Sequence, residues 1–172
     1  MKKKHLYIVT IRVLLVTSIY QCFNREGACA QKVNHNFATS NIELPKFTSN
    51  RSQQIIHHLA YTVSYNPKWK IPNWVAYELT RGETYGDAPR RKKFTPDPLV
   101  KGYRVQHSDY SNSGYDRGHM APAADMKWAE QAMRESFYMT NVCPQNQSLN
   151  RGDWNDLEEL ARDWARKYGS IY

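Results

Sequence analysis

The sequence predicts an α+β fold, and three stretches of the chain carry this prediction. The stretches 59–65 (LAYTVSY) and 74–80 (WVAYELT) have the aromatic and β-branched content that is typical of strands. The turn-rich segment NPKWKIPN separates them, so we expect an antiparallel hairpin with a long connection. From about residue 151 to residue 168, apolar side chains recur at three- and four-residue steps, which predicts a long amphipathic helix.

We expect the apolar face of this long helix to be part of the core, and Gly169 to end the helix. The face consists of Trp154, Leu157, Leu160, Ala161, Trp164 and Tyr168. A second helical segment is expected over residues 125–139 (DMKWAEQAMRESFYM). Between the two, residues 137–147 (FYMTNVCPQNQ) are expected to hold a short strand or extended segment and then a polar loop.

Residues 1–30 have the layout of a secretory signal peptide. A basic start at residues 2–4 precedes a mostly apolar run over residues 6–20, and ACA at 28–30 offers a cleavage site. The run is shorter than the roughly 20 apolar residues of a membrane span, and Arg12 lies inside it. An uncleaved anchor and a soluble tail are the alternatives. We therefore expect a secreted or periplasmic protein with a polar leader over 31–54 and one domain over 55–172.

Composition excludes wholesale disorder, because 41% of residues are hydrophobic and 23% are charged. The formal charge is +8. Five of the 24 basic and one of the 16 acidic side chains lie in residues 1–30, so a cut there leaves +4. This mild excess is compatible with a polyanionic partner. Cys143 is then the lone cysteine, which cannot form an internal disulfide and is expected to be structural.

The stretch SGYDRGHMAPAADM, residues 113–126, is the strongest candidate for chemistry. Near pH 7 a neutral imidazole at His119 can take a proton from water. The planar fork of Arg117 suits phosphate oxygens, and Gly118 permits a tight backbone path that lets both side chains reach one phosphate. This set suits the hydrolysis of a phosphodiester. A structural histidine and a surface salt bridge are the plainer interpretations of His119 and Arg117.

Two later polar residues, Asn150 and Glu158, could hold a divalent cation. Mg²⁺ prefers oxygen ligands and keeps several waters, and Mn²⁺ is the alternative ion. Asn150 lies near the start of the expected helix, where it could also merely cap it. Glu158 is about 12 Å further along the axis, so we expect it to act through water, unless it is an ordinary exposed helix glutamate. Paired His/Cys spacing for zinc, a Gly-rich phosphate loop and a nucleophile elbow are all missing from the sequence.

The basic run RRKK at residues 90–93 is either a solvated surface loop or a groove for a nucleic-acid backbone.

Four blocks of the chain resemble the DNA/RNA non-specific endonucleases, a family that includes secreted bacterial nucleases and mitochondrial endonuclease G. The blocks are NPKWKIPNWVAYELT, DRGHMAPAADM, FYMTNVCPQ and LNRGDWNDLE. They occur in this order, and the resemblance covers about residues 55–172. The resemblance implies a ββα-metal (His-Me finger) nuclease fold with an antiparallel sheet and a long metal-site helix. It also implies cleavage of DNA and RNA with little sequence preference, because the backbone is gripped instead of the base edges.

The resemblance also implies roles for individual residues. His119 would be the general base, Asn150 the magnesium ligand, and Arg117 the group that stabilises the phosphate or the leaving group. Asn141 would help to place the histidine, Glu158 would hold a metal-bound water, and Asp116 would support the local structure. An upstream basic residue that contacts phosphate would correspond to Arg90, Arg91 or Lys92.

Family members continue past the long helix, whereas this sequence ends at KYGSIY. We therefore expect a domain that is incomplete at its C-terminus. The predicted function is that of a Mg²⁺-dependent endonuclease whose partners are DNA and RNA, with no membrane partner once the signal is cleaved. The alternative is a non-catalytic protein that binds nucleic acid or another polyanion on a truncated nuclease scaffold.

Overall fold

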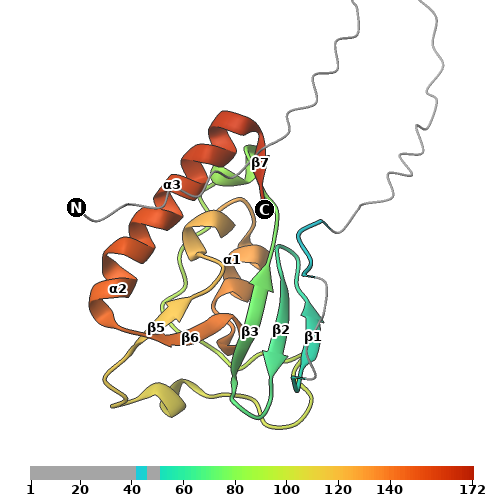
Figure 1. Cartoon of the computed structure of the whole chain (residues 1–172), viewed down its shortest axis with the longest axis vertical. Coiled ribbons are helices and arrows are strands. Elements are labelled where there is room, and N and C mark those ends of the chain that lie inside the picture. Colours follow the sequence, from blue (N-terminus) through green and yellow to red (C-terminus); the bar gives the residue numbers. More distant parts are fainter. Residues whose placement is uncertain (1–41, 46–50) are drawn as a thin grey trace, which may run out of the picture. The chain divides into compact units, whose positions relative to one another are not determined.

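The computed structural model describes residues 42–45 and 51–172, and it confirms a mixed fold of helices and antiparallel strands (Figure 1). The strands are β1 Gln54–His57, β2 Thr62–Asn66, β3 Ile71–Ala76, β4 Leu79–Thr80, β5 Asp116–His119, β6 Val142–Gln145 and β7 Ser170–Ile171. The α-helices are α1 Glu130–Ser136, α2 Gln147–Arg151 and α3 Asp153–Tyr168. Short 3₁₀ turns are η1 Gly82–Thr84, η2 His107–Tyr110, η3 Ala123–Met126 and η4 Met139–Asn141.

The predicted hairpin is confirmed as β2 and β3, which pair antiparallel with Val63 opposite Val75. The expectation of a long connection is wrong, because only residues 67–70 separate the two strands. The turn is held by Asn66, whose side-chain oxygen accepts hydrogen bonds from the backbone N–H groups of Lys68 and Trp69, both at 3.0 Å. Lys70 closes the turn with a positive φ of 61°. The strand β1, which the sequence did not predict, adds to β2 and completes a sheet of order β1-β2-β3.

The predicted strand 74–80 is wrong in its second half. β3 ends at Ala76, and Leu79–Thr80 leaves the sheet to pair with β7 in a separate two-stranded sheet. The DRGH motif forms β5, which pairs antiparallel with β6. This ribbon lies between the three-stranded sheet and the α2–α3 pair (Figure 1).

The predicted helix over 125–139 is interrupted, whereas the predicted long helix over about 151–168 is confirmed as α3. The segment 125–139 divides into η3, α1 and η4, because Ala129 adopts an extended backbone before α1. A short helix α2, which the sequence did not predict, precedes α3 and is separated from it at Gly152. Asn146 caps α2, so Asn150 is not a helix cap. Asn150 therefore lies in the last turn of α2, with its own N–H bonded to the Asn146 carbonyl at 2.9 Å.

The main core lies where the three-stranded sheet meets β6 and the segments around α1. Its most deeply buried members include Val63, Tyr65, Ala121, Met126, Ala132, Met139 and Val142. A smaller cluster of Ala123, Met133 and Phe137 lies beside it and receives Phe94.

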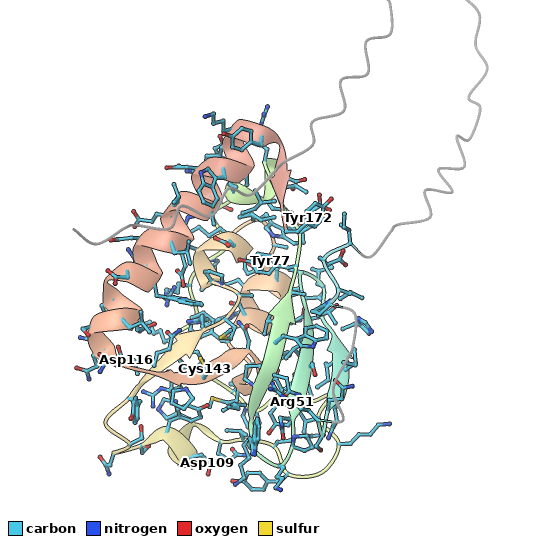
Figure 2. The ribbon with its side chains drawn as sticks, viewed as in Figure 1. Arg51, Tyr77, Asp109, Asp116, Cys143 and Tyr172 are labelled. Carbon is cyan, nitrogen blue, oxygen red and sulfur yellow. The ribbon has the colours of Figure 1, made fainter. Side chains whose placement is uncertain are left out.

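The prediction that the tryptophan and tyrosine face of the long helix is core is wrong. Trp164 is 42% exposed and Tyr168 is 66% exposed, and within α3 only Ala165 is buried. Leu157 and Leu160 are also exposed, and no described element covers them. Part of this face borders a groove of about 440 Å³, the apolar groove. It is lined by Tyr77, Leu79, Met120, Pro122, Trp154, Leu157, Glu158, Ala161, Trp164, Ile171 and Tyr172 (Tyr77 and Tyr172 are labelled in Figure 2).

The expected signal peptide, and most of the expected leader, lie outside the described residues. Within 42–45 and 51–172, none of the helices has both the length and the apolar character that crossing a membrane requires.

Candidate active site

One polar cavity of about 270 Å³ brings together residues from separate parts of the chain. It is lined by Arg90, Phe94, Arg117, His119, Pro122, Ala123, Ala124, Asn150, Asn155, Glu158 and Arg162. Of the residues that the sequence singled out, His119, Arg117, Asn150, Glu158 and Arg90 line this cavity. Asp116, Asn141 and Arg91 do not, and each has a different position described below.

His119 ends β5 and is only 9% exposed. Its ring lies between two aromatic side chains, with centroids 4.9 Å from both Phe94 and Phe137. Burial, and then the nearby Arg90 guanidinium, lower the pKa of His119 from 6.5 to about 4. Its Nε2 is buried without a hydrogen-bond partner among the described residues. The imidazole is therefore neutral at neutral pH and can accept a proton.

Gly118 is required for packing. The tight backbone path expected between Arg117 and His119 is instead an extended strand. A Cβ at this position would collide with the side chain of Gln145, which lies on the neighbouring strand β6. Glycine thus lets β6 approach the backbone between Arg117 and His119 closely.

Asn141 is fully buried and holds the chain just after His119. Its Oδ1 accepts from the Ala121 N–H at 2.8 Å, and its Nδ2 donates to the Ala121 carbonyl at 2.9 Å. Its own carbonyl accepts from the Met120 N–H at 2.9 Å, and its Nδ2 also donates to the Ser136 carbonyl at 2.9 Å. These four bonds fit a residue that positions β5, outside the cavity itself.

Asp116 points to α2 (Figure 2) and orients Asn150. The Asn150 Nδ2 donates to Asp116 at 3.1 Å, and Arg151 donates to both carboxylate oxygens at 3.0 and 3.1 Å. Hydrogen bonds from Arg151 and then Asn150 lower the pKa of Asp116, so it is ionised. Because the amide nitrogen of Asn150 is engaged, its Oδ1 is the atom left to bind a cation.

Glu158 is a half-buried carboxyl on α3. Burial, and then the charge of Asp125, raise its pKa from 4.5 to about 7, although the Arg162 guanidinium opposes this. Arg162 donates to Asp125 at 2.9 Å, and the Tyr77 hydroxyl donates to the other Asp125 oxygen at 2.8 Å. Glu158 therefore lacks an ion-pair partner of its own among the described residues, and a cation in the cavity would favour its ionised form.

Two guanidinium groups lie over the aromatic rings that enclose His119. Arg90 lies 5.3 Å from the centroid of Phe137, and Arg117 lies 5.9 Å from that of Phe94. Of the three upstream candidates, only Arg90 lines the cavity, whereas Arg91 and Lys92 are exposed outside it.

A buried polar cluster anchors the segment that carries Phe94. Asp97 is 1% exposed and accepts from Thr140 Oγ1 at 2.6 Å, His58 Nε2 at 2.9 Å and the Leu99 N–H at 2.9 Å. Burial raises the pKa of Asp97, but these hydrogen bonds outweigh it and lower the pKa overall. Asp97 lies three residues after Phe94, and its partner Thr140 adjoins Asn141. The cluster therefore holds two segments next to His119, the one that carries Phe94 and the one that carries Asn141.

The oxygen donors of the cavity fit a hard divalent cation. The Asn150 Oδ1 and the Glu158 carboxylate face the same space, and both are ligand types that Mg²⁺ or Mn²⁺ accepts. In the described part of the chain, no three or more His, Cys, Asp or Glu side chains are grouped to hold a metal. A cation here would therefore keep most of its water.

Sequence reasoning missed four contributors to this site: Phe94, Phe137, Asp125 and Arg162. Arg162 carried a signal, because it follows Glu158 by four residues and such pairs share a helix face. Phe94 and Phe137 lie far from His119 in the chain, and no local pattern ties them to it.

Comparisons with known proteins agree with this geometry. The family model for DNA/RNA non-specific endonuclease matches residues 38–172. The chain is 39% identical over 127 residues to the mitochondrial nuclease EXOG of Xenopus laevis, covering 73% of this chain and 35% of that protein. It is 37% identical over 132 residues to mitochondrial endonuclease G of Homo sapiens, covering 76% and 44%. A nuclease of Nostoc sp. is 40% identical over 114 residues, covering 65% and 41%.

A solved structure of EndoG bound to EndoGI has the same fold, with a TM-score of 0.63 and 33% identity, covering 69% of this chain and 50% of that one. This likeness confirms the predicted ββα-metal fold. The chain thus spans less than half the length of the relatives named above and half of the solved chain. Because the family model covers most of the sequence, and Arg117, His119, Asn150 and Glu158 line one cavity, the chain belongs to the DNA/RNA non-specific endonuclease family.

Proposed function

We propose that this chain is a sequence-non-specific endonuclease that hydrolyses phosphodiester bonds of DNA and RNA with a divalent cation, Mg²⁺ or alternatively Mn²⁺. One observation carries the proposal. His119 and Arg117 from β5, Asn150 from α2 and Glu158 from α3 line the same polar cavity. These are a proton acceptor, a phosphate-binding cation and two hard oxygen donors, which is the set that the reaction needs.

In the proposed mechanism, His119 takes the proton from the attacking water. Its burial between Phe94 and Phe137 keeps it neutral, and an anionic phosphate in the cavity would raise its basicity toward neutral pH. Asn141 acts as a positioning residue, since it fixes the backbone that follows His119.

Arg117 and Arg90 would bind the non-bridging phosphate oxygens, because both guanidinium groups reach the cavity. Asn150 would ligate the cation directly through Oδ1, and Glu158 would hold it through water. When bound, the cation supplies positive charge against the extra charge of the transition state and of the leaving oxygen. Contacts of this kind reach only the backbone, which fits low sequence preference.

Nicking of supercoiled plasmid tests the proposal. His119→Ala should reduce the rate by roughly 10²–10⁴-fold, and EDTA should abolish wild-type nicking. His107→Ala, an exposed histidine outside the cavity, is the matched control and should nick normally. Undiminished nicking by His119→Ala, or by the wild type in EDTA, would rule out the mechanism.

The alternative of a non-catalytic binder is not favoured, because the cavity retains every side-chain type that hydrolysis needs. It nevertheless makes a distinct prediction for the same samples. A binder would retard DNA on a gel in a salt-dependent way and leave it intact when Mg²⁺ is added.

We further propose that the protein is secreted or periplasmic, on the strength of the basic and apolar residues at its N-terminus. Export of a tagged full-length chain would support this, if the mass of the exported protein shows that about 30 N-terminal residues have been removed. Retention of the intact N-terminus in the cytoplasm would contradict it.

A further inference from the structure

A second cavity of about 390 Å³, the aromatic pocket, lies at the other end of the β5–β6 ribbon from His119. The exposed residues Trp69, Lys70, Tyr115 and Pro144 lie at its rim, and the buried Tyr110 forms part of its floor. Trp69 is 57% exposed and Tyr115 is 55% exposed, whereas Tyr110 is buried. A volume of this size suits a small-molecule moiety. The function proposed above makes no use of these rings.

Several contacts hold the segments that surround the pocket. Asn66 holds the turn that presents Trp69, and Lys70 lies 4.2 Å above the ring of Tyr103. The Tyr110 hydroxyl donates to the Val142 carbonyl at 3.3 Å, which ties the floor to β6.

The aromatic pocket and the proposed catalytic cavity both adjoin the β5–β6 ribbon, and one pair of opposed residues links them. Arg117 lines the polar cavity, and its partner across the ribbon is Pro144, which lines the aromatic pocket. Side chains of directly opposed residues lie on the same face of an antiparallel pair. Tyr115 immediately precedes β5 and is two residues before Arg117, so the aromatic pocket lies next to the strand that carries the cavity residues.

The charges of the pocket favour a base over a phosphate as its occupant. Asp109 lines it (Figure 2 labels this residue), and its carboxylate accepts from the Tyr103 hydroxyl and the Gln106 N–H. The Gln106 N–H, and more weakly the Tyr103 hydroxyl, lower the pKa of Asp109, which is therefore ionised. A carboxylate repels a phosphate but accepts hydrogen bonds from the exocyclic amino group of a base. Lys70, on the rim, is placed to meet the adjoining phosphate.

We propose that the aromatic pocket binds an unpaired nucleobase of the substrate strand, whose backbone continues across Arg117 to the catalytic cavity. This rests on the proposed function, and it adds a preference for single-stranded over double-stranded nucleic acid. A duplex keeps its bases stacked on one another, so their faces cannot reach Trp69 or Tyr115.

Binding is measured separately from cleavage. The protein is the full chain with His119→Ala, and the buffer contains EDTA, so that the probes are not cut. The probes are a fluorescent short single strand and the same sequence as a duplex. Trp69→Ala and Tyr115→Ala should each weaken single-strand binding about tenfold and change duplex binding less than about twofold, the size expected for one lost base–ring stack. Trp69→Phe should retain most of the affinity.

Salt dependence distinguishes stacking from charge. Trp69→Ala should leave the slope of log affinity against log salt unchanged. Lys70→Ala should make that slope shallower by about one unit, the amount expected for the loss of one phosphate contact. Tyr168→Ala removes an equally exposed ring from α3 and should have no effect on either probe.

Unchanged single-strand affinity in Trp69→Ala and Tyr115→Ala, or an equal loss for both probes, would overturn the proposal. Because these measurements need no cleavage, they stand even if the wild-type protein fails to nick plasmid. Conversely, if the wild type nicks plasmid but Trp69→Ala binds the single strand as tightly as its parent, the base pocket is refuted and the proposed hydrolysis still stands.

Discussion

Replacing Glu158 by glutamine should stabilise the protein at alkaline pH and leave its stability unchanged in acid. In the folded chain the pKa of this carboxyl is raised from 4.5 to about 7, by burial first and by Asp125 second. The folded state therefore binds more protons than the unfolded state between those two pH values. It follows that the stability falls as the pH rises through this window, and the full cost is present above about pH 7.

The size of the effect follows from the same difference. Each pKa unit corresponds to about 1.4 kcal/mol, which sets a ceiling of about 3 kcal/mol for the cost of ionising Glu158. The side chain is only half-buried, and water screens it, so we expect about 1–2 kcal/mol. In a domain of this size, that corresponds to a rise in Tm of roughly 3–8 °C.

Thermal unfolding in EDTA at about pH 4 and about pH 8 measures this difference. Glu158→Gln should unfold at a higher temperature than the wild type only at the higher pH. The matched control is Glu159→Gln, an exposed neighbour on the same helix, which should show no such pH dependence. Added Mg²⁺ should narrow the gap, because a cation offsets the charge of the carboxylate. A variant that is less stable at pH 8, or equally shifted at both pH values, would refute the reasoning.

Three further substitutions test the supports of the site. Gly118→Ala should cost about 1–3 kcal/mol of unfolding free energy because of its collision with Gln145; denaturant melts measure it, and the double variant with Gln145→Ala should recover part of the loss. Asp97→Ala should cost about 3 kcal/mol at neutral pH, since it strands three donors, and this difference should shrink as the pH falls through the lowered pKa of Asp97. Asp116→Ala should raise the Mg²⁺ concentration needed for half-maximal nicking about 10–100-fold, because it releases the Asn150 amide; an unchanged requirement would contradict this role.

Local patterns predicted those parts of the structure that local forces determine. The β2–β3 hairpin follows from strand-forming residues on both sides of a turn that Asn66 closes on its own backbone. The amphipathic repeat located α3 to within a few residues. The DRGH block, Asn150 and Glu158 were found by their chemistry and their resemblance to a family, and the structure places His119, Asn150 and Glu158 in one cavity.

Other features depend on contacts between distant segments, and no local pattern reveals them. DRGH has little strand propensity of its own, and it is extended because β6 pairs with it. The aromatic walls around His119 come from Phe94 and Phe137. Periodicity identified an apolar face on α3, but it could not show whether another element packs over that face.

Glu158 lines both the polar cavity and the apolar groove, so the two spaces share a wall. Its protonation is consequently sensitive to what occupies the apolar groove. A polypeptide or an apolar compound seated against Leu157 and Trp164 would expel solvent from that wall and make ionisation of the carboxyl harder still. The affinity of the site for a divalent ion would then depend on whether the apolar groove is occupied.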